Sequence, residues 1–184
     1  MFHAESEPFS LQRDVEAIII PAGEKIMLHE GVDGYITQAL GGSFTVYVDG
    51  NLFRIAGHDA DALGKEPVLP PAVPENATDD DIEQLVWKQL RTCYDPEIPI
   101  NIVDLGLVYR CELKKREDGL REAEVDMTLT APGCGMGDVL VQDVISKLEI
   151  LDTIDKVAVE LVFDPPWNHT MMSDEARLQT GMMY

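Results

Sequence analysis

Two segments in the second half of the chain alternate apolar and polar residues with the period of two that a half-exposed β-strand requires. Their apolar positions are Leu107, Tyr109, Cys111 and Leu113 in the first segment, and Ala123, Val125, Met127 and Leu129 in the second. The connection around Asp118-Gly119 is short and polar, as in a hairpin. The sequence therefore predicts two antiparallel strands that each turn one face toward a core, with Cys111 as a core thiol.

A helix and a third strand are predicted next. Residues 137–151 carry apolar side chains at helical spacing, and residues 157–163 alternate again. A strand, a helix and a strand in succession normally form a right-handed parallel unit. The end of segment 157–163 is therefore expected beside the end of segment 123–129, in a mixed three-stranded sheet.

The region before this sheet begins with a predicted helix. Thr78 can cap a helix whose first turn holds three consecutive aspartates, where the helix dipole favours negative charge. Apolar residues then recur at helical spacing as far as Cys93, which is therefore expected in the core. Together these elements predict an α+β domain over residues 78–184, in the order helix, strand, strand, helix, strand.

The N-terminal part of the chain has a different pattern. Residues 1–64 contain short segments rich in β-branched and aromatic residues, and Asp49-Gly50 between two of them is typical of a tight hairpin. We expect a small all-β module there. Residues 65–77 are rich in proline, which is incompatible with a helix or a central strand, so an extended linker is expected.

The charge of the chain limits the classes of partner that it can bind. Lysine and arginine number 14 against 34 aspartates and glutamates, and the formal net charge is −20 at pH 7. Such a chain repels the phosphate backbone of nucleic acids and the surface of anionic membranes. We therefore expect no nucleic-acid partner and no membrane partner.

The sequence also bears on location. The N-terminus lacks the pattern of a secretory signal, no stretch is apolar enough to span a bilayer, and three scattered cysteines suggest no disulfide framework. A cytoplasmic location is expected.

The predicted sheet brings three segments together at one edge: 95–106, 130–137 and 164–172. In sheets whose strands are connected by helices, ligand-binding sites commonly lie beyond the carboxyl ends of the strands. The first segment carries three carboxylates, those of Asp95, Glu97 and Asp104. In the third segment, Trp167 is expected to line the crevice between the three segments or to face a partner. His169 is a candidate metal ligand.

Cys134 in the middle segment is the strongest candidate for chemistry. Gly133 and Gly135 flank it, and the predicted helix begins at Gly137. A helix N-terminus contributes roughly 0.3–1 kcal/mol, which at about 1.4 kcal/mol per pKa unit lowers a thiol pKa by less than one unit. Nearby carboxylates oppose a bare thiolate and favour a cation that deprotonates the sulfur. Metal or cluster chemistry is therefore preferred over simple covalent catalysis.

These residues resemble the SufT family of iron-sulfur cluster assembly proteins, whose C-terminal domain is PaaD-like. The resemblance rests on three motifs in order: Asp95-Pro96-Glu97-Ile98-Pro99, Thr128-Leu129-Thr130-Ala131-Pro132-Gly133-Cys134 and Asp164-Pro165-Pro166-Trp167. The N-terminal module, with Gly57-His58-Asp59-Ala60-Asp61-Ala62-Leu63-Gly64, is similar to the extension that distinguishes SufT from its single-domain relatives.

The resemblance implies an accessory role in the assembly or delivery of iron-sulfur clusters, in contact with the assembly machinery and apo client proteins. It implies Cys134 as the functional thiol, with Asp95, Glu97, Asp104 and Thr130 lining the site, and it implies self-association. A cluster is usually held by four thiolates. One usable thiol per chain therefore fits only transient binding of iron or an iron-sulfur cluster, and no organic cofactor is expected.

Two other functions remain open at this point. Cys134 could be the nucleophile of an acyl or sulfur transferase, but that chemistry needs a base, for which His169 is the only histidine near the crevice. Alternatively, the protein could be an adaptor that docks clients through Trp167 and the methionines without binding a cluster. The clients and the role of the N-terminal module are not predicted by the sequence.

Overall fold

The computed structural model describes residues 6–95, 98–133 and 135–181. The chain forms two compact units, Met1–Pro70 and Pro71–Tyr184. Each unit has its own cluster of buried apolar residues.

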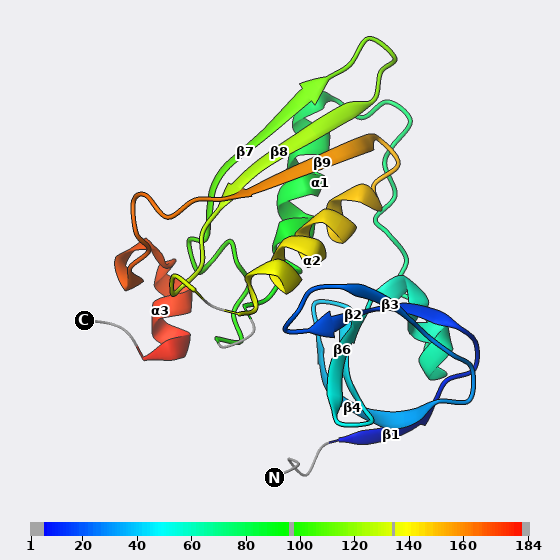
Figure 1. The fold of residues 1–184 in the computed structure, drawn as a ribbon. Coiled ribbons are helices and arrows are strands. Elements are labelled where there is room, and N and C mark those ends of the chain that lie inside the picture. The colour runs from blue at the N-terminus through cyan, green and yellow to red at the C-terminus, as the bar shows by residue number, and fades with distance from the viewer. Residues whose placement is uncertain (1–5, 96–97, 134, 182–184) are drawn as a thin grey trace. The chain divides into compact units, whose positions relative to one another are not determined.

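The N-terminal unit is a six-stranded antiparallel sheet whose strands curve around a common interior (Figure 1). The strands are β1 (Glu7–Ser10), β2 (Val15–Ile20), β3 (Lys25–Leu28), β4 (Asp33–Leu40), β5 (Ser43–Val48) and β6 (Asn51–Ile55). Their spatial order is β1-β4-β5-β6-β2-β3. The turn between β5 and β6 is the Asp49-Gly50 hairpin predicted from the sequence, and both of its residues have positive φ.

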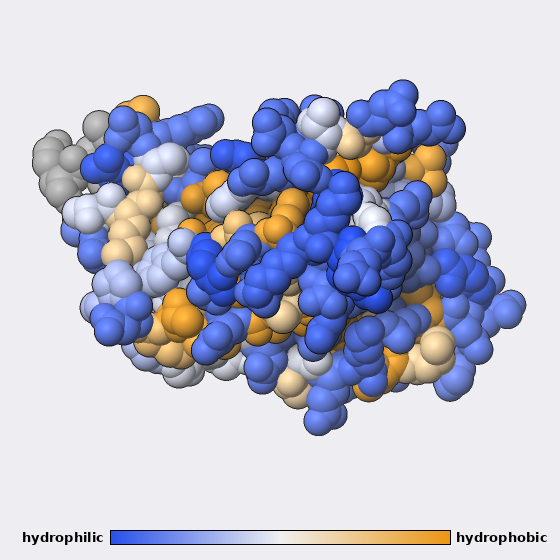
Figure 2. Space-filling view, turned by 90° about the horizontal axis from the view of Figure 1, so that it is seen from above, coloured by the Kyte–Doolittle hydropathy of each residue, from blue (hydrophilic) through white to orange (hydrophobic). Residues whose placement is uncertain are grey.

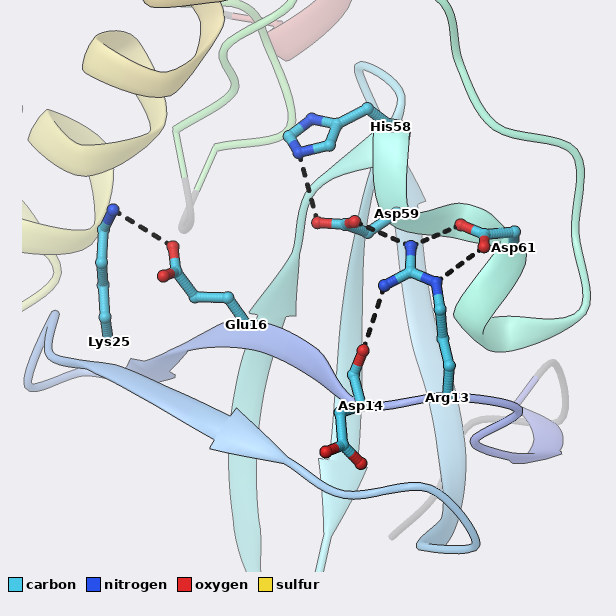
Figure 3. A network of polar contacts seen from close by, with 7 residues as sticks. All are labelled: Arg13, Asp14, Glu16, Lys25, His58, Asp59 and Asp61. Atoms are coloured by element: carbon cyan, nitrogen blue, oxygen red, sulfur yellow. Dashed lines mark hydrogen bonds and ion pairs between the residues drawn. The ribbon is translucent and has the colours of Figure 1, made fainter.

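The unit also contains a 3-10 helix, η1 (Gly57–Leu63), where only strands were expected. The side chains of Ala60 and Ala62 are fully buried in the core. Arg13 holds η1 in place: its Nε and Nη2 donate to the Asp61 carboxylate at 2.7 and 2.6 Å, and Nη2 also donates to Asp59 at 2.9 Å (Figure 3). The alternation of aspartate and alanine in this segment thus has a structural explanation. The alanines pack into the core, and the aspartates bind Arg13.

The C-terminal unit combines helices with a three-stranded sheet (Figure 1). Its elements are α1 (Asp79–Leu90), β7 (Val108–Lys115), β8 (Arg121–Met127), α2 (Gly137–Glu149), β9 (Ile154–Leu161), η2 (His169–Met171) and α3 (Asp174–Thr180). β7 pairs with β8 antiparallel, and β8 pairs with β9 parallel. The prediction of an α+β fold with a mixed three-stranded sheet is confirmed.

Local signals in the sequence account for the placement of α1. The Thr78 side chain accepts from the Asp81 amide at 3.2 Å, and the Asp81 carboxylate accepts from the Thr78 amide at 2.9 Å, which completes a capping box. Gln89 Nε2 donates to the Lys147 carbonyl of α2 at 2.8 Å. Cys93, one turn beyond, is fully buried in the core, as the helical spacing predicted.

Two details of the sheet differ from the alternation pattern. The β7–β8 register shifts between Val108 and Arg110, so Tyr109 sits at a β-bulge and Val108 packs against the core. β9 ends at Leu161, and Phe163 is 44% exposed instead of continuing the buried face. The alternation pattern placed Tyr109, and Phe163 at the end of segment 157–163, on the core face. Both placements were wrong, because a bulge and an early strand end each interrupt the alternation.

The outer face of the sheet carries ion pairs. Arg110 contacts Glu112, Glu124 and Asp126, and Lys114 also contacts Glu124. Such exposed pairs contribute little individually to stability. On the side of the molecule drawn in Figure 2, hydrophilic residues dominate the surface, in keeping with the net charge of −20.

Within the described residues, no helix is both long enough and apolar enough to cross a membrane.

Candidate functional site at one edge of the three-stranded sheet

The ends of β8 and β9 and the start of β7 lie at the same edge of the sheet. Met127 is paired with Leu161 on one side and with Val108 on the other. The backbone ladder continues past the strands, because the Val162 amide donates to the Met127 carbonyl at 2.8 Å. The segments that follow β8 and β9 and the segment that precedes β7 therefore leave the sheet together, as predicted.

The first and third of these segments pack directly against each other. Trp167 Nε1 donates to the Leu105 carbonyl at 2.7 Å, and the amide of Ser173, directly after the third segment, donates to the Asp104 carbonyl at 2.8 Å. Gly106 has φ +75°, and a Cβ built on it would lie 2.3 Å from the Met171 carbonyl oxygen. Only glycine fits this contact, which fixes the distance between the two segments.

Tyr109 connects the bulge in β7 to the third segment. Its hydroxyl donates to the Pro165 carbonyl at 2.8 Å. The alternation pattern could not reveal this role, because it assigned Tyr109 to the core face. A bulge at the start of a strand re-aims one side chain, and here that side chain stabilises the segment that carries Trp167.

The middle segment leads from β8 into α2. Thr130 is half-buried, and Gly133 and Gly135 are exposed. Gly133 has φ +78° and nothing within 4 Å of where a Cβ would stand. Cys134 lies outside the described residues, so the structure gives the position of its neighbours only.

Two of the three carboxylates expected at the site stabilise the fold of their own segment. Asp95 is buried, and its Oδ1 accepts from the Ile98 amide at 2.9 Å. Asp104 Oδ2 accepts from Asn101 Nδ2 at 2.6 Å. Glu97 lies outside the described residues. Asp95 and Asp104 thus hold the turns that bring Leu105 and Gly106 against the third segment.

A polar group that the sequence reasoning missed lies at the same edge. Thr128, directly after β8, is 1% exposed, and its Oγ1 has no hydrogen-bond partner within the described part of the chain. Its amide donates to the Leu107 carbonyl at 2.8 Å. Thr128 begins the second motif of the sequence, and the alternation pattern places it opposite the apolar residues of its strand, so neither feature signalled its burial.

His169 begins η2 and is exposed. Across residues 6–95, 98–133 and 135–181, no group of three or more histidine, cysteine, aspartate or glutamate side chains is arranged to hold a metal ion. Any metal chemistry at this edge therefore depends on Cys134 or on groups supplied from outside these ranges.

The hydrogen bond of Trp167 allows a first prediction. Replacing Trp167 with phenylalanine keeps most of the packing but removes the donor to Leu105, and we expect a loss of about 1–2 kcal/mol in the free energy of unfolding. Denaturant unfolding followed by the fluorescence of Trp87 measures it. Trp87→Phe with Trp167 as the probe is the control, because the Trp87 indole makes no hydrogen bond in the described structure. Equal losses in both variants would remove the hydrogen bond from this explanation.

Cys111 lies outside this site, in a pocket that raises the pKa of its thiol. It lines a pocket of about 310 Å³ together with Asp79, Glu83 and Arg121. Burial, and then the negative charge of Glu83, raise the pKa of Cys111 to about 11. The thiol is therefore protonated at neutral pH.

This pKa leads to a second prediction. At pH 8 we expect Cys111 to react with iodoacetamide about a hundredfold more slowly than an ordinary thiol of pKa near 8.5, because only the thiolate attacks. The rate should rise about tenfold per pH unit up to pH 10. Peptide mapping by mass spectrometry at a series of pH values measures it, with Glu83→Gln expected to shift the curve to lower pH. A rate that levels off near pH 9 would contradict the assignment.

The chain is similar in sequence to known proteins. The family model described as "Iron-sulfur cluster assembly protein" matches residues 83–161, which include the first two segments of the edge. A "Fe-S protein maturation auxiliary factor" of Porphyromonas gingivalis W83 is 44% identical over 101 residues, 55% of this chain and 92% of the relative.

Two further relatives match about half of this chain and nearly all of their own length. The "Fe-S protein maturation auxiliary factor SufT" of Staphylococcus aureus USA300 is 40% identical over 48% of this chain and 96% of its own length. The "Fe-S protein maturation auxiliary factor YitW" of Bacillus subtilis 168 is 34% identical over 55% of this chain and 95% of its own length. This chain belongs to the iron-sulfur cluster assembly protein family.

Proposed function

We propose that the protein is an accessory factor in the assembly of iron-sulfur clusters or their delivery to client proteins, and that it acts through the Cys134 thiolate. The observation that carries this proposal is the 44% identity with a relative named an Fe-S protein maturation auxiliary factor, over 92% of that relative. The cluster or its iron is cargo in this proposal, held in transit.

The surroundings of Cys134 support transient binding. Both neighbours of residue 134 in the chain, Gly133 and Gly135, are exposed, and a Cβ built on Gly133 would meet nothing within 4 Å. The start of α2 at Gly137 directs backbone N–H groups toward this loop. Since a thiolate is the form that ligates iron, the positive end of α2 favours the reactive form of the sulfur.

A single thiolate cannot satisfy a cluster, which usually takes four. We propose that the remaining ligands come from a second copy of the chain, from a small thiol or from the client. Glu97, Thr130 and, with a lesser role, His169 are proposed to line the cargo. Asp95 and Asp104 contribute chiefly by fixing the turns beside it, since each already accepts a hydrogen bond within its segment.

A maturation assay tests the proposal. An apo form of a [4Fe–4S] enzyme is incubated without oxygen with iron, sulfide and this protein, and the recovery of enzyme activity is followed. We expect the protein to accelerate recovery and Cys134→Ser to remove about nine-tenths or more of the acceleration, because a serine hydroxyl is a poor ligand for iron. Cys111→Ser is the matched control. Acceleration by Cys134→Ser equal to that of the unaltered protein would refute the proposed role.

The adaptor function is less well supported by the same contacts. Met172 is buried, Met171 packs against Gly106, and the Trp167 indole is bonded within its own unit. These side chains already serve the packing of the edge. Under the adaptor function, Trp167→Ala would stop maturation while Cys134→Ser would not, which is the reverse of the result expected here.

A further inference from the structure

The outer face of the N-terminal sheet carries an unbroken apolar row across five strands. Register pairs join Pro8 of β1 to Tyr35 of β4, Tyr35 to Tyr47 of β5, Tyr47 to Leu52 of β6, and Leu52 to Ile20 of β2. Residues paired in this way share one face of a sheet. We call Pro8, Tyr35, Tyr47, Leu52 and Ile20 the outer row.

The outer row is not required by the core of this unit. The core is made by the residues on the opposite face, such as Val46 and Phe53, which are 0% and 5% exposed. Tyr35 and Leu52, by contrast, are 47% and 37% exposed. Single exposed apolar residues are ordinary, but a contiguous row of them commonly marks an interaction surface.

One end of the outer row opens into a pocket of about 410 Å³. Pro8, Tyr35 and Tyr47 line it together with Asp33 and Asp49. The carboxylates of Asp33 and Asp49 form no ion pair and accept no hydrogen bond in the described parts of the chain. The pocket therefore combines two aromatic side chains with two uncompensated negative charges.

The shape of this pocket is fixed by the backbone. A Cβ built on Gly34, which also lines the pocket, would lie 2.4 Å from the Tyr47 carbonyl oxygen and 2.9 Å from a ring carbon of Phe9. Glycine thus permits β4 to approach β5 closely at the point where the two tyrosines stand side by side. The site is formed before any partner arrives, which lowers the cost of binding.

We propose that the outer row and its pocket dock an apolar segment of a basic partner protein, with an arginine or lysine side chain seated in the pocket against Tyr35 and Tyr47. Tyrosine rings attract a cation placed over their faces, and Asp33 and Asp49 supply the opposite charge. The leucine and isoleucine at the other end of the row contact the apolar residues of the segment. This docking function is independent of the Cys134 chemistry.

The net charge decides between a foreign partner and a second copy. The chain carries −20, so a second copy would bring the same charge against this acidic pocket. A cationic segment is attracted, and its association should weaken as salt is added. Charge complementarity therefore favours a basic partner.

Peptide binding to the full chain tests the proposal. The probe is acetyl-Leu-Arg-Leu-Arg-Leu-amide, and its counterpart replaces both arginines with glutamate. By nuclear magnetic resonance titration we expect only the arginine peptide to bind, with shifts confined to the outer row and pocket. Tyr35→Ala combined with Tyr47→Ala should weaken binding by about tenfold or more.

Charge variants separate the contribution of the aspartates to binding from that of the tyrosines. Asp33→Asn combined with Asp49→Asn should weaken binding several-fold and flatten its salt dependence, whereas Glu24→Gln with Glu66→Gln, the same charge change elsewhere in the unit, should leave it unchanged. Should the double tyrosine variant lose its fold by circular dichroism, Tyr35→Ser alone, at an exposed position, replaces it. Equal binding of the two peptides, unchanged binding by the aspartate variants, or self-association through Tyr35 and Tyr47 in sedimentation would each overturn the proposal.

Discussion

Replacing Cys134 with serine is expected to reduce the iron and sulfide retained after anaerobic loading to the level of a protein that was never loaded. The sulfur of Cys134 is the proposed ligand, and the described residues include no other cluster of side chains arranged to hold a metal. Iron and sulfide assays, together with visible absorbance, measure the retained cargo.

The other cysteines provide controls within the same chain. Cys93 is fully buried, and the Cys111 thiol has its pKa raised to about 11, so neither offers an accessible thiolate near pH 7. Cys111→Ser should therefore retain the cargo of the unaltered protein. If Cys111→Ser lost cargo while Cys134→Ser kept it, the site would have been assigned to the wrong thiol.

Replacing Gly106 with alanine is expected to cost on the order of 2–4 kcal/mol in the free energy of unfolding of the C-terminal unit. The residue has φ +75°, and its new Cβ would lie 2.3 Å from the Met171 carbonyl oxygen, so both a strained backbone and a displaced segment contribute. Denaturant unfolding followed by tryptophan fluorescence reports on this unit, because both tryptophans of the chain, Trp87 and Trp167, belong to it.

Gly119→Ala is the matched control for this substitution. Gly119 has φ +85°, but a Cβ built on it would meet nothing within 4 Å. The substitution should therefore lower the free energy of unfolding by only about 1 kcal/mol, the cost of the left-handed backbone. Gly106→Ala should also displace Trp167 from the Leu105 carbonyl and change its emission. Similar losses at both glycines would mean that the contact between the first and third segments contributes little to stability.

The architecture of the C-terminal unit was predictable because its signals are local and repeated. Alternation over residues 107–113 and 123–129, a helix between two strands, and the cap at Thr78 each point to the same sheet, and the mixed pairing follows from the handedness of parallel connections. The meeting of three segments at one edge is a consequence of that topology.

What the sequence could not predict depends on single tertiary contacts. The bulge at Tyr109 is set by the pairing with β8 and by the hydroxyl contact with Pro165. Asp95 and Thr128 are 5% and 1% exposed, although both are polar, and no local pattern in the sequence predicts that burial. The 3-10 helix η1 is held by Arg13, more than forty residues earlier, so no local pattern announced it.

The most direct test of the central claim is protection of the Cys134 sulfur by its cargo. The protein, loaded with iron and sulfide or left unloaded, is exposed to iodoacetamide without oxygen at pH 7.5, and the labelling of each cysteine is followed by mass spectrometry. The proposal predicts that Cys134 is labelled readily when unloaded and about tenfold or more slowly when loaded, because a coordinated thiolate is no longer a free nucleophile. Equal labelling of Cys134 in the two samples, with cargo still bound, would show that the cargo is held elsewhere.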